Sequence, residues 1–266
     1  MPPTPPRPAG RAPRRASASQ VAGELLLTAG IVLLLFAFYE AFWTNLASGK
    51  LQDNAQHSLE STWVNPRTVK TPQLGDVLAR MYIPAFGADY QFAIIEGVGE
   101  EDLRAGPGRY PDTQLPGRPG NFAVAGHRVG KGAPFNDLGK LNACDAIVVE
   151  TQTHWLTYRV LPMTTDPQQR AGEASRCMGT RLAPRVAAGD YSGVLGRHIT
   201  TPNDVSVLNP VPGTARVEVA PGAEALLTLT TCHPQFSNAE RMIIHAVMVE
   251  AVDKAAGPPA AMKEVS

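Results

Sequence analysis

Short strand-like segments separated by glycine and proline fill residues 76–252. The regular interruption by these two residue types constrains the fold more than any other feature of the chain. Residues 77–83 end at Pro84, and residues 90–96 end at Gly97. Proline and glycine interrupt strand pairing, so each segment predicts one short strand. Strands at this spacing predict a mainly β fold, a small closed or nearly closed barrel with short helices. Further segments of this kind are 121–125, 146–150, 155–160, 225–232 and 242–249.

Residues 163–200 do not follow this pattern of short strands. They are rich in arginine, glycine, alanine and proline and hold few sustained apolar alternations. A segment of this length without a clear pattern is either a functional loop or partly disordered, so we expect a surface insertion. After the last strand, residues 253–266 read as a polar C-terminal tail.

The beginning of the chain divides into a basic segment and an apolar one. Residues 1–20 hold four arginines, six prolines and no acidic residue, and we expect them to be disordered because they cannot bury a core. Residues 21–43 are mostly Leu, Ala, Val, Ile and Phe. Their length reaches the roughly 20 residues that a spanning helix needs. No small-x-small cleavage site follows the apolar core, which favours a retained transmembrane anchor over a cleaved signal peptide.

Charges on the two sides of this anchor predict its orientation. Arginines precede it and only Lys50 follows soon after, so we expect a cytoplasmic N-terminus and an extracellular remainder on a single-pass membrane protein. Residues 44–75 are polar and hold Pro66 and Pro72, which indicates an extracellular stalk. Part of residues 51–63 can continue as a helix, but a solvated spacer is the favoured interpretation.

Composition argues against several classes of function. With 24 basic and 24 acidic residues the formal net charge is zero, so we expect no nucleic-acid partner. The three cysteines lack metal-ligand spacing and no acidic cluster resembles a calcium loop, so we predict no metal and no cofactor. Three cysteines in an exported chain leave at least one unpaired. A disulfide between Cys144 and Cys177 is one arrangement, and it would leave Cys232 as the free thiol.

One of the predicted strands ends on a cysteine. Leu227 and Leu229 alternate with threonines, which is the period of a strand with one buried face. The strand reaches Cys232 just before Pro234, which cannot extend the ladder. Arg241 then opens the next strand, so pairing of the two strands would return the guanidinium close to the thiol. This is the outline of a thiol active site that still lacks a base.

The base must come from the six histidines, because a thiol at its ordinary pKa is mostly protonated at neutral pH. His127 follows a short apolar strand and Gly126, whose flexibility would let the side chain enter a cleft; an ordinary loop histidine is the alternative. His233 directly follows the cysteine, and adjacent residues of an extended chain point to opposite sides. The weaker candidates are His57, His154, His198 and His245.

Arg241 cannot lose its proton at any useful pH, so it cannot be the base. It can donate hydrogen bonds to the oxyanion that forms when a thiolate attacks an amide carbonyl. The alternative is a surface ion pair with Glu240 or Glu224, and spacing alone does not decide between the two roles.

Two motifs resemble one known family. Thr-Leu-Thr-Thr-Cys at residues 228–232, with Arg241 downstream and Ala-Gly-His-Arg at residues 125–128 upstream, resembles the sortases. These are membrane-anchored cysteine transpeptidases of Gram-positive bacteria. The resemblance covers residues 76–252 and the anchor expected of the family.

Further motifs look most like the class E sortases of actinobacteria. They are Cys-His-Pro at residues 232–234 and Gly-Pro-Gly-Arg-Tyr at residues 106–110. The insertion at residues 163–200 departs from the family pattern because it is longer.

The resemblance implies a closed eight-stranded sortase-type β-barrel and a set of roles. Cys232 would be the nucleophile, His127 the general acid and base, and Arg241 the donor to the substrate carbonyl or oxyanion. The bond cleaved would be the Thr–Gly bond of a C-terminal sorting motif, with LAxTG favoured over LPxTG. The residues expected to contact substrate are Tyr110, Thr230 and Thr231.

The partners implied by the resemblance are secreted proteins that carry the sorting signal and a peptidoglycan precursor amine. The amine would resolve the thioester and join the protein to the cell wall. Two other functions stay open: a secreted cysteine peptidase that hydrolyses the motif without transfer, and a membrane-anchored binding domain with a degenerate site. The presence of His127, Cys232 and Arg241 argues against the degenerate site.

Overall fold

The computed structural model describes residues 17–39, 43–64 and 71–265, in two compact units, residues 1–43 and 44–266. In the first unit, α1 (Ala18–Phe38) is long and apolar enough to cross a membrane, and none of its residues is buried. Its first N–H groups are capped by Ser17, whose side chain accepts a hydrogen bond from the backbone of Gln20. The helix therefore begins within the predicted tail, of which residues 1–16 lie outside the described residues, as do residues 40–42 of the predicted anchor.

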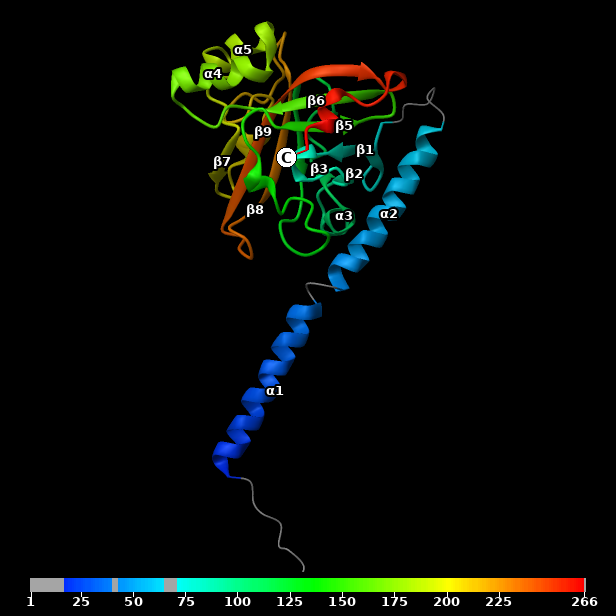
Figure 1. Cartoon of the computed structure of the whole chain (residues 1–266), viewed down its shortest axis with the longest axis vertical. Helices are drawn as coiled ribbons and strands as arrows, with labels where there is room; N and C mark the ends of the chain where they lie inside the picture. The colour runs from blue at the N-terminus through cyan, green and yellow to red at the C-terminus, as the bar shows by residue number, and fades with distance from the viewer. Residues whose placement is uncertain (1–16, 40–42, 65–70, 266) are drawn as a thin grey trace, which may run out of the picture. The chain divides into compact units, whose positions relative to one another are not determined.

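The second unit is built on a closed β-barrel, as predicted (Figure 1). The part of the chain that the structure describes holds nine strands, in the order β6-β5-β1-β2-β3-β4-β8-β9-β7. An additional β6–β9 pairing closes the ring, and β7 pairs with β9 outside it, so eight strands form the barrel. The bounds are β1 Val77–Tyr82, β2 Gln91–Glu96, β3 Gly108–Arg109, β4 Gly120–Ala125, β5 Ala146–Glu150, β6 His154–Val160, β7 Arg197–Thr200, β8 Ala225–His233 and β9 Glu240–Asp253.

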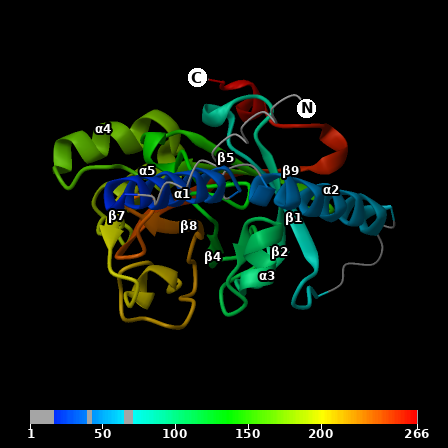
Figure 2. The same cartoon turned by 90° about the horizontal axis from the view of Figure 1, so that it is seen from below.

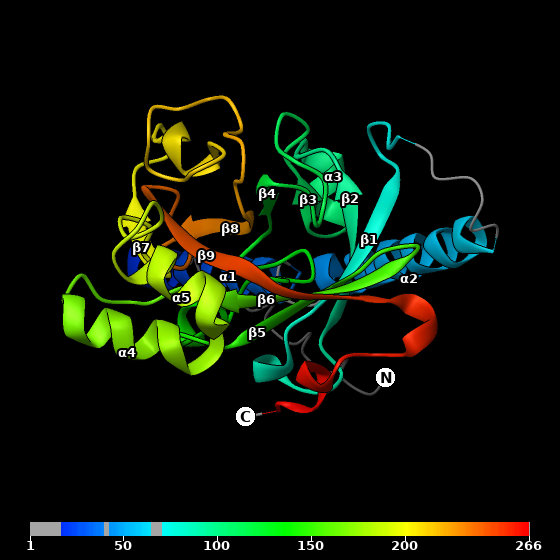
Figure 3. The same ribbon diagram turned by 90° about the horizontal axis from the view of Figure 1, so that it is seen from above.

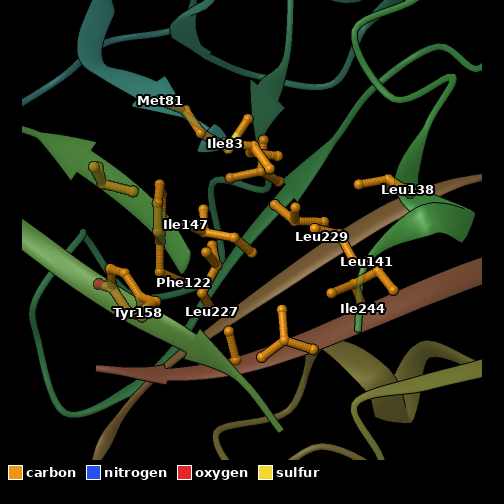
Figure 4. Close-up of a cluster of buried hydrophobic side chains, with 14 of the residues drawn as sticks. Met81, Ile83, Phe122, Leu138, Leu141, Ile147, Tyr158, Leu227, Leu229 and Ile244 are labelled. Atoms are coloured by element: carbon orange, nitrogen blue, oxygen red, sulfur yellow. The ribbon is translucent and has the colours of Figure 1, made fainter. Parts of the chain in front are cut away.

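The barrel interior is filled by alternate residues of β1, β4, β5, β6, β8 and β9 (Figure 4). Phe122 of β4, Leu227 and Leu229 of β8 and Ile244 of β9 all point inward and are fully buried. The alternation that the sequence predicted for β8 is therefore correct. Because Leu227 and Leu229 face inward, Thr228, Thr230 and Cys232 belong to the outer face of the barrel, and Thr231 does not.

Residues 44–63 do not form the solvated spacer that the sequence predicted. They form α2 (Thr44–Trp63), which packs against β1, β2 and α3 (Glu100–Ala105), as Figure 2 shows from below. Leu59 is buried, and the Gln52 side chain bonds the backbone N–H and carbonyl of Ala93 and the carbonyl of Ala105. A polar residue supplies much of this contact, so hydrophobic periodicity alone underestimated it. Residues 65–70 of the predicted stalk lie outside the described residues.

The end of α2 and the C-terminal tail are also fixed to the barrel. The Nζ atom of Lys254 lies 3.5 Å from the centroid of the Trp63 ring, a cation–π contact. The tail forms two short helical turns, η5 (Lys254–Ala256) and η6 (Ala260–Lys263). Ala261 is buried against Trp155, so the polar composition of the tail conceals a packed segment. Single short helical turns elsewhere are η2 (Pro84–Phe86), η3 (Leu138–Lys140) and η4 (Val205–Leu208).

The predicted insertion is ordered. It forms α4 (Pro167–Cys177), α5 (Gly179–Ala187) and β7; α5 lies beside β9, and α4 packs against α5 (Figure 3). Arg170 is buried, and its guanidinium donates to the carbonyls of Thr164, Val186, Tyr191 and Val194. A buried arginine that bonds backbone carbonyls leaves no periodic signal, which explains why partial disorder was an open expectation.

Cys144 and Cys177 form a disulfide that ties the end of α4 to the loop before β5, the bridge that the sequence left open. Cys232 is the free cysteine.

Replacing both Cys144 and Cys177 by serine should destabilise the barrel unit. The bridge spans a sequence separation of 33, and its loss restores entropy to the unfolded chain. We expect the free energy of unfolding to fall by about 3–4 kcal/mol, with a drop of about 10 °C in Tm. Thermal unfolding followed by circular dichroism measures both. A reductant should lower the Tm of the wild type and leave the double variant unchanged; an equal Tm for both proteins would contradict the expectation.

Candidate active site

Cys232 lies directly opposite Arg241 in the antiparallel ladder of β8 and β9. Directly opposed residues of such a pair project to the same face, with Cβ atoms about 4.5–5.5 Å apart. The strand pairing that the sequence predicted is therefore present, and it brings the guanidinium-bearing residue back beside the thiol. Both residues lie on the outer face of the barrel.

His127 reaches the same region through the parallel pairing of β4 with β8. Ala125 is the register partner of Thr230, and the Gly126 N–H donates to the Thr230 carbonyl. His127 is the next residue along the chain, just beyond the end of β4. Parallel strands bring their carboxyl ends to the same edge of a sheet, so the ends of β4 and β8 deliver histidine and cysteine together.

Gly126 is required for close packing rather than for flexibility, which corrects the reason that the sequence suggested. A Cβ atom at this position would lie 2.6 Å from the ring of Phe135. The same aromatic residue donates its N–H to the carbonyl of His127 at 3.0 Å. The chain on both sides of the histidine is therefore in contact with Phe135.

The environment of His127 favours the neutral imidazole. Burial lowers its pKa below the ordinary value, and the charge of Lys131 lowers it further, whereas Glu100 raises it. The Nε2 atom is buried and has no hydrogen-bond partner among the residues that the structure describes. A half-buried neutral histidine at this place can accept a proton from a thiol.

The thiol and the guanidinium both contact the β8–β9 turn. The Cys232 Sγ lies 3.4 Å from Oδ1 of Asn238. Nη1 of Arg241 donates to the carbonyls of Asn238 and Glu240. No pattern in the sequence pointed to Asn238, because a turn asparagine is expected for conformational reasons alone.

The other five histidines are engaged elsewhere. His57 is exposed on α2 and His154 lies in the β5–β6 turn beside Thr153. Nη1 of Arg128 lies 2.6 Å from Nδ1 of His233, and because arginine can only donate, this nitrogen accepts. The same Nη1 donates to the Cys232 carbonyl. Arg128 directly follows His127 in the sequence, so its position close to Cys232 could have been predicted from the position of His127.

His245 and His198 lie farther along β9 and β7. His245 is buried on the outer face of β9, and burial lowers its pKa to about 3. Its Nδ1 lies 2.8 Å from the hydroxyl of Thr228, which donates to Asn121. His198 has its ring centroid 5.5 Å from that of His245. These histidines contact each other and the hydroxyl of Thr228 rather than the thiol, so the placement favours His127 as the base.

Among the three expected substrate contacts, Tyr110 and Thr230 lie together. The Tyr110 hydroxyl is 3.0 Å from the Thr230 hydroxyl. Thr231 lies on the opposite face of β8, where its hydroxyl donates to the carbonyl of Gly126 at 2.8 Å. The Thr231 side chain therefore links the end of β4 to β8, next to His127.

A buried ion pair holds the residue before Tyr110. The Arg109 guanidinium donates from two nitrogens to both carboxylate oxygens of Glu96, and both side chains are buried. The same guanidinium donates to backbone carbonyls of Pro111, Thr113 and Gln114. A bidentate pair of this kind fixes orientation, so the loop that carries Tyr110 is held in one conformation.

A cavity of about 550 Å³ lies away from these residues and contains none of His127, Cys232 and Arg241. It is bounded by the end of α2, the β5–β6 turn and β9. Its lining includes Trp63, Leu115, Arg118, His154, Leu156 and Met248. The thiol chemistry therefore belongs to the outer face of β8 and not to this cavity.

Comparison with known proteins gives a consistent result. The sortase domain matches residues 81–249. Sortase SrtE1 of Streptomyces coelicolor is 31% identical over 253 residues, which are 92% of this chain and 61% of that protein, so the chain spans less than two thirds of this relative. The structure of the SrtF sortase from Corynebacterium diphtheriae is 60% identical with a TM-score of 0.73, over 75% of this chain and 98% of that one.

A crystal structure of sortase E1 from Streptomyces coelicolor, with a tripeptide in its active site, is also similar. It is 29% identical with a TM-score of 0.52, over 72% of this chain and 99% of that chain. The class E resemblance seen in the sequence is thus confirmed, and SrtF shares a still higher identity. The domain match, the barrel and the outer-face thiol all agree: the protein belongs to the sortase family, whose members are cysteine transpeptidases.

Proposed function

We propose that this protein is a membrane-anchored transpeptidase that cleaves a C-terminal sorting motif between Thr and Gly and transfers the cleaved protein to a cell-wall amine. One observation carries the proposal: Cys232 and Arg241 are register partners in β8 and β9, and His127 follows two residues after Ala125, the register partner of Thr230. The tripeptide bound in the active site of sortase E1 supports a peptide substrate.

In the first half of the reaction, the Cys232 sulfur attacks the threonine carbonyl of the substrate. The thiol proton passes to His127, and the carbonyl oxygen becomes an oxyanion that accepts hydrogen bonds from Arg241. His127 then gives its proton to the glycine nitrogen as the Thr–Gly bond breaks. The products are a thioester on Cys232 and a free amine.

In the second half, an amine of a peptidoglycan precursor attacks the thioester. His127 takes a proton from the attacking nitrogen, and Cys232 leaves as the thiolate and receives that proton from His127. The new amide bond replaces the one that was broken, so no oxidant, cofactor or external energy source is needed. Water in place of the amine would give hydrolysis.

The Tyr110–Thr230 pair suggests how the motif is read. The two hydroxyls lie 3.0 Å apart on the face that carries Cys232. We propose that Tyr110 lines the pocket for the second motif position, where its bulk favours Ala over Pro, and that Thr230 contacts the substrate backbone. Thr231 then acts indirectly, because its hydroxyl bonds the carbonyl of Gly126.

The properties of α1 support a location in the membrane. A 21-residue apolar helix without a buried residue is stable in lipid rather than in water. With the arginines before it, we propose a single-pass anchor with a cytoplasmic N-terminus and an extracellular catalytic unit. The substrates would then be secreted proteins that carry the sorting signal.

Replacing Cys232 by alanine should abolish cleavage of an LAxTG peptide by the full-length protein in detergent micelles. Peptide cleavage measured by chromatography, with and without a primary amine, also separates the possible reactions. A transpeptidase gives an amide adduct with the amine, whereas a peptidase gives only the free acid. Cleavage that persists in Cys232→Ala would refute the mechanism. Failure of Cys232 in the wild type to react with an electrophilic analogue of the motif would indicate a degenerate site.

The pH dependence of kcat/KM should report the charges around His127. Burial and Lys131 lower the pKa of His127 below its ordinary value, so activity should be kept below pH 6.5 and lost only as His127 becomes protonated before reaction. Lys131→Gln removes a lowering charge and should move the acid limb to higher pH. Glu100→Gln removes a raising charge and should move it to lower pH. Shifts of both variants in the same direction would contradict this assignment.

A further inference from the structure

The loop that follows His127 has an unusual backbone. Four successive residues have left-handed φ angles: Gly130 at 61°, Lys131 at 49°, Gly132 at 78° and Ala133 at 39°. This conformation suits the two glycines, but it is strained for lysine and alanine. Residues 130–133 therefore need neighbours that hold them in place.

The first turns of α2 supply those neighbours. Oδ1 of Asn45 accepts a hydrogen bond from the N–H of Gly132 at 2.9 Å. A Cβ atom at Gly132 would lie 3.6 Å from the Ser48 side chain, and one at Gly130 would lie 3.7 Å from the Thr44 hydroxyl. The N-terminal end of α2 is thus in contact with the strained residues.

α2 is itself fixed to the barrel one turn further on. The Gln52 amide accepts from the N–H of Ala93 and donates to the carbonyls of Ala93 and Ala105. The fit is close, because a Cβ atom at Gly106 would lie 1.8 Å from Nε2 of Gln52. The helix therefore connects β2 to residues 130–133 as a rigid element.

The loop after His127 carries a charged residue, Lys131, that influences the imidazole, and Phe135, which contacts the backbone around the histidine. The Nζ of Lys131 lies 3.6 Å from Oε1 of Glu100, at the start of α3. These are the two charged groups that influence the imidazole, and burial is the larger influence. Phe135 closes the loop by its N–H bond to the His127 carbonyl. A shift of residues 130–133 would change the charge and the solvent exposure around the ring.

We propose that α2 positions the catalytic histidine, with Asn45 as the positioning residue: its bond to Gly132 holds residues 130–133, and these hold His127 in its catalytic orientation. Asn45 touches no reacting atom. The inference rests on the proposed function, since it assigns Asn45 to the same site. The segment next to the membrane anchor in the sequence thereby becomes part of the catalytic apparatus.

Asn45→Ala tests this in the full-length protein in detergent micelles. We expect kcat for an LAxTG peptide to fall about tenfold with KM little changed, because misplaced catalytic groups lose rate steeply. The pKa of His127, followed by NMR of isotope-labelled histidine, should rise toward its ordinary value as water reaches the ring. Asn45→Gln, which displaces the acceptor oxygen by one methylene, should show the same losses.

Two variants control for effects on the helix alone. Asn54→Ala removes an exposed asparagine of the same helix and should leave kcat and the pKa of His127 unchanged. Asn45→Asp keeps an oxygen that can accept from Gly132 and should retain kcat. Equal losses in Asn54→Ala, or wild-type kcat and His127 pKa in both Asn45→Ala and Asn45→Gln, would overturn the proposal.

The test separates this inference from the proposed function. If the wild type fails to cleave the peptide, the proposed function fails, but the NMR titration of His127 still tests the positioning. If the wild type cleaves and the two acceptor variants keep the wild-type pKa of His127, the positioning alone is refuted.

Discussion

β8 pairs along one edge with β4 and along the other with β9, and these two registers decide where every reactive group lies. The parallel ladder brings the end of β4 beside the end of β8, and the antiparallel ladder starts β9 at the same place. A slip of one residue in β8 would turn Cys232 inward and Leu229 outward, which the filled barrel does not allow. The packing of Leu227 and Leu229 in the core thus keeps the thiol on the outside.

A site on the outer face of a barrel must obtain its low-dielectric surroundings from elements outside the strands. For His127 these are the loop around Phe135, the charge pair of Lys131 and Glu100, and the start of α2. Two left-handed non-glycine residues cost on the order of 1–3 kcal/mol each. A single hydrogen bond contributes about 0.5–1.5 kcal/mol net, so several contacts together must hold this loop.

The sequence predicted the barrel, the strand that carries Cys232 and the return of Arg241, because period-two alternation and turn residues record these features directly. It also supplied His127, although a wrong role was given to Gly126, whose neighbour Phe135 is nine residues away. α2 and the insertion were harder to predict. Gln52 and Arg170 hold them through backbone carbonyls, and the positions of those carbonyls follow only from the completed fold. The contact of Asn45 with Gly132 is non-local in the same way.

The docking of α2 also determines how much of the chain can be removed without damage. A protein cut at residue 76 would keep every strand and all of the reacting residues. It would lose Gln52, and the N–H and carbonyl of Ala93 would lose their side-chain partner, together with the apolar contact of Leu59. Each buried polar group left unpaired costs about 1–3 kcal/mol. The compact unit therefore begins at Thr44, the first residue of α2, and a soluble form made for crystallisation or assay should start there.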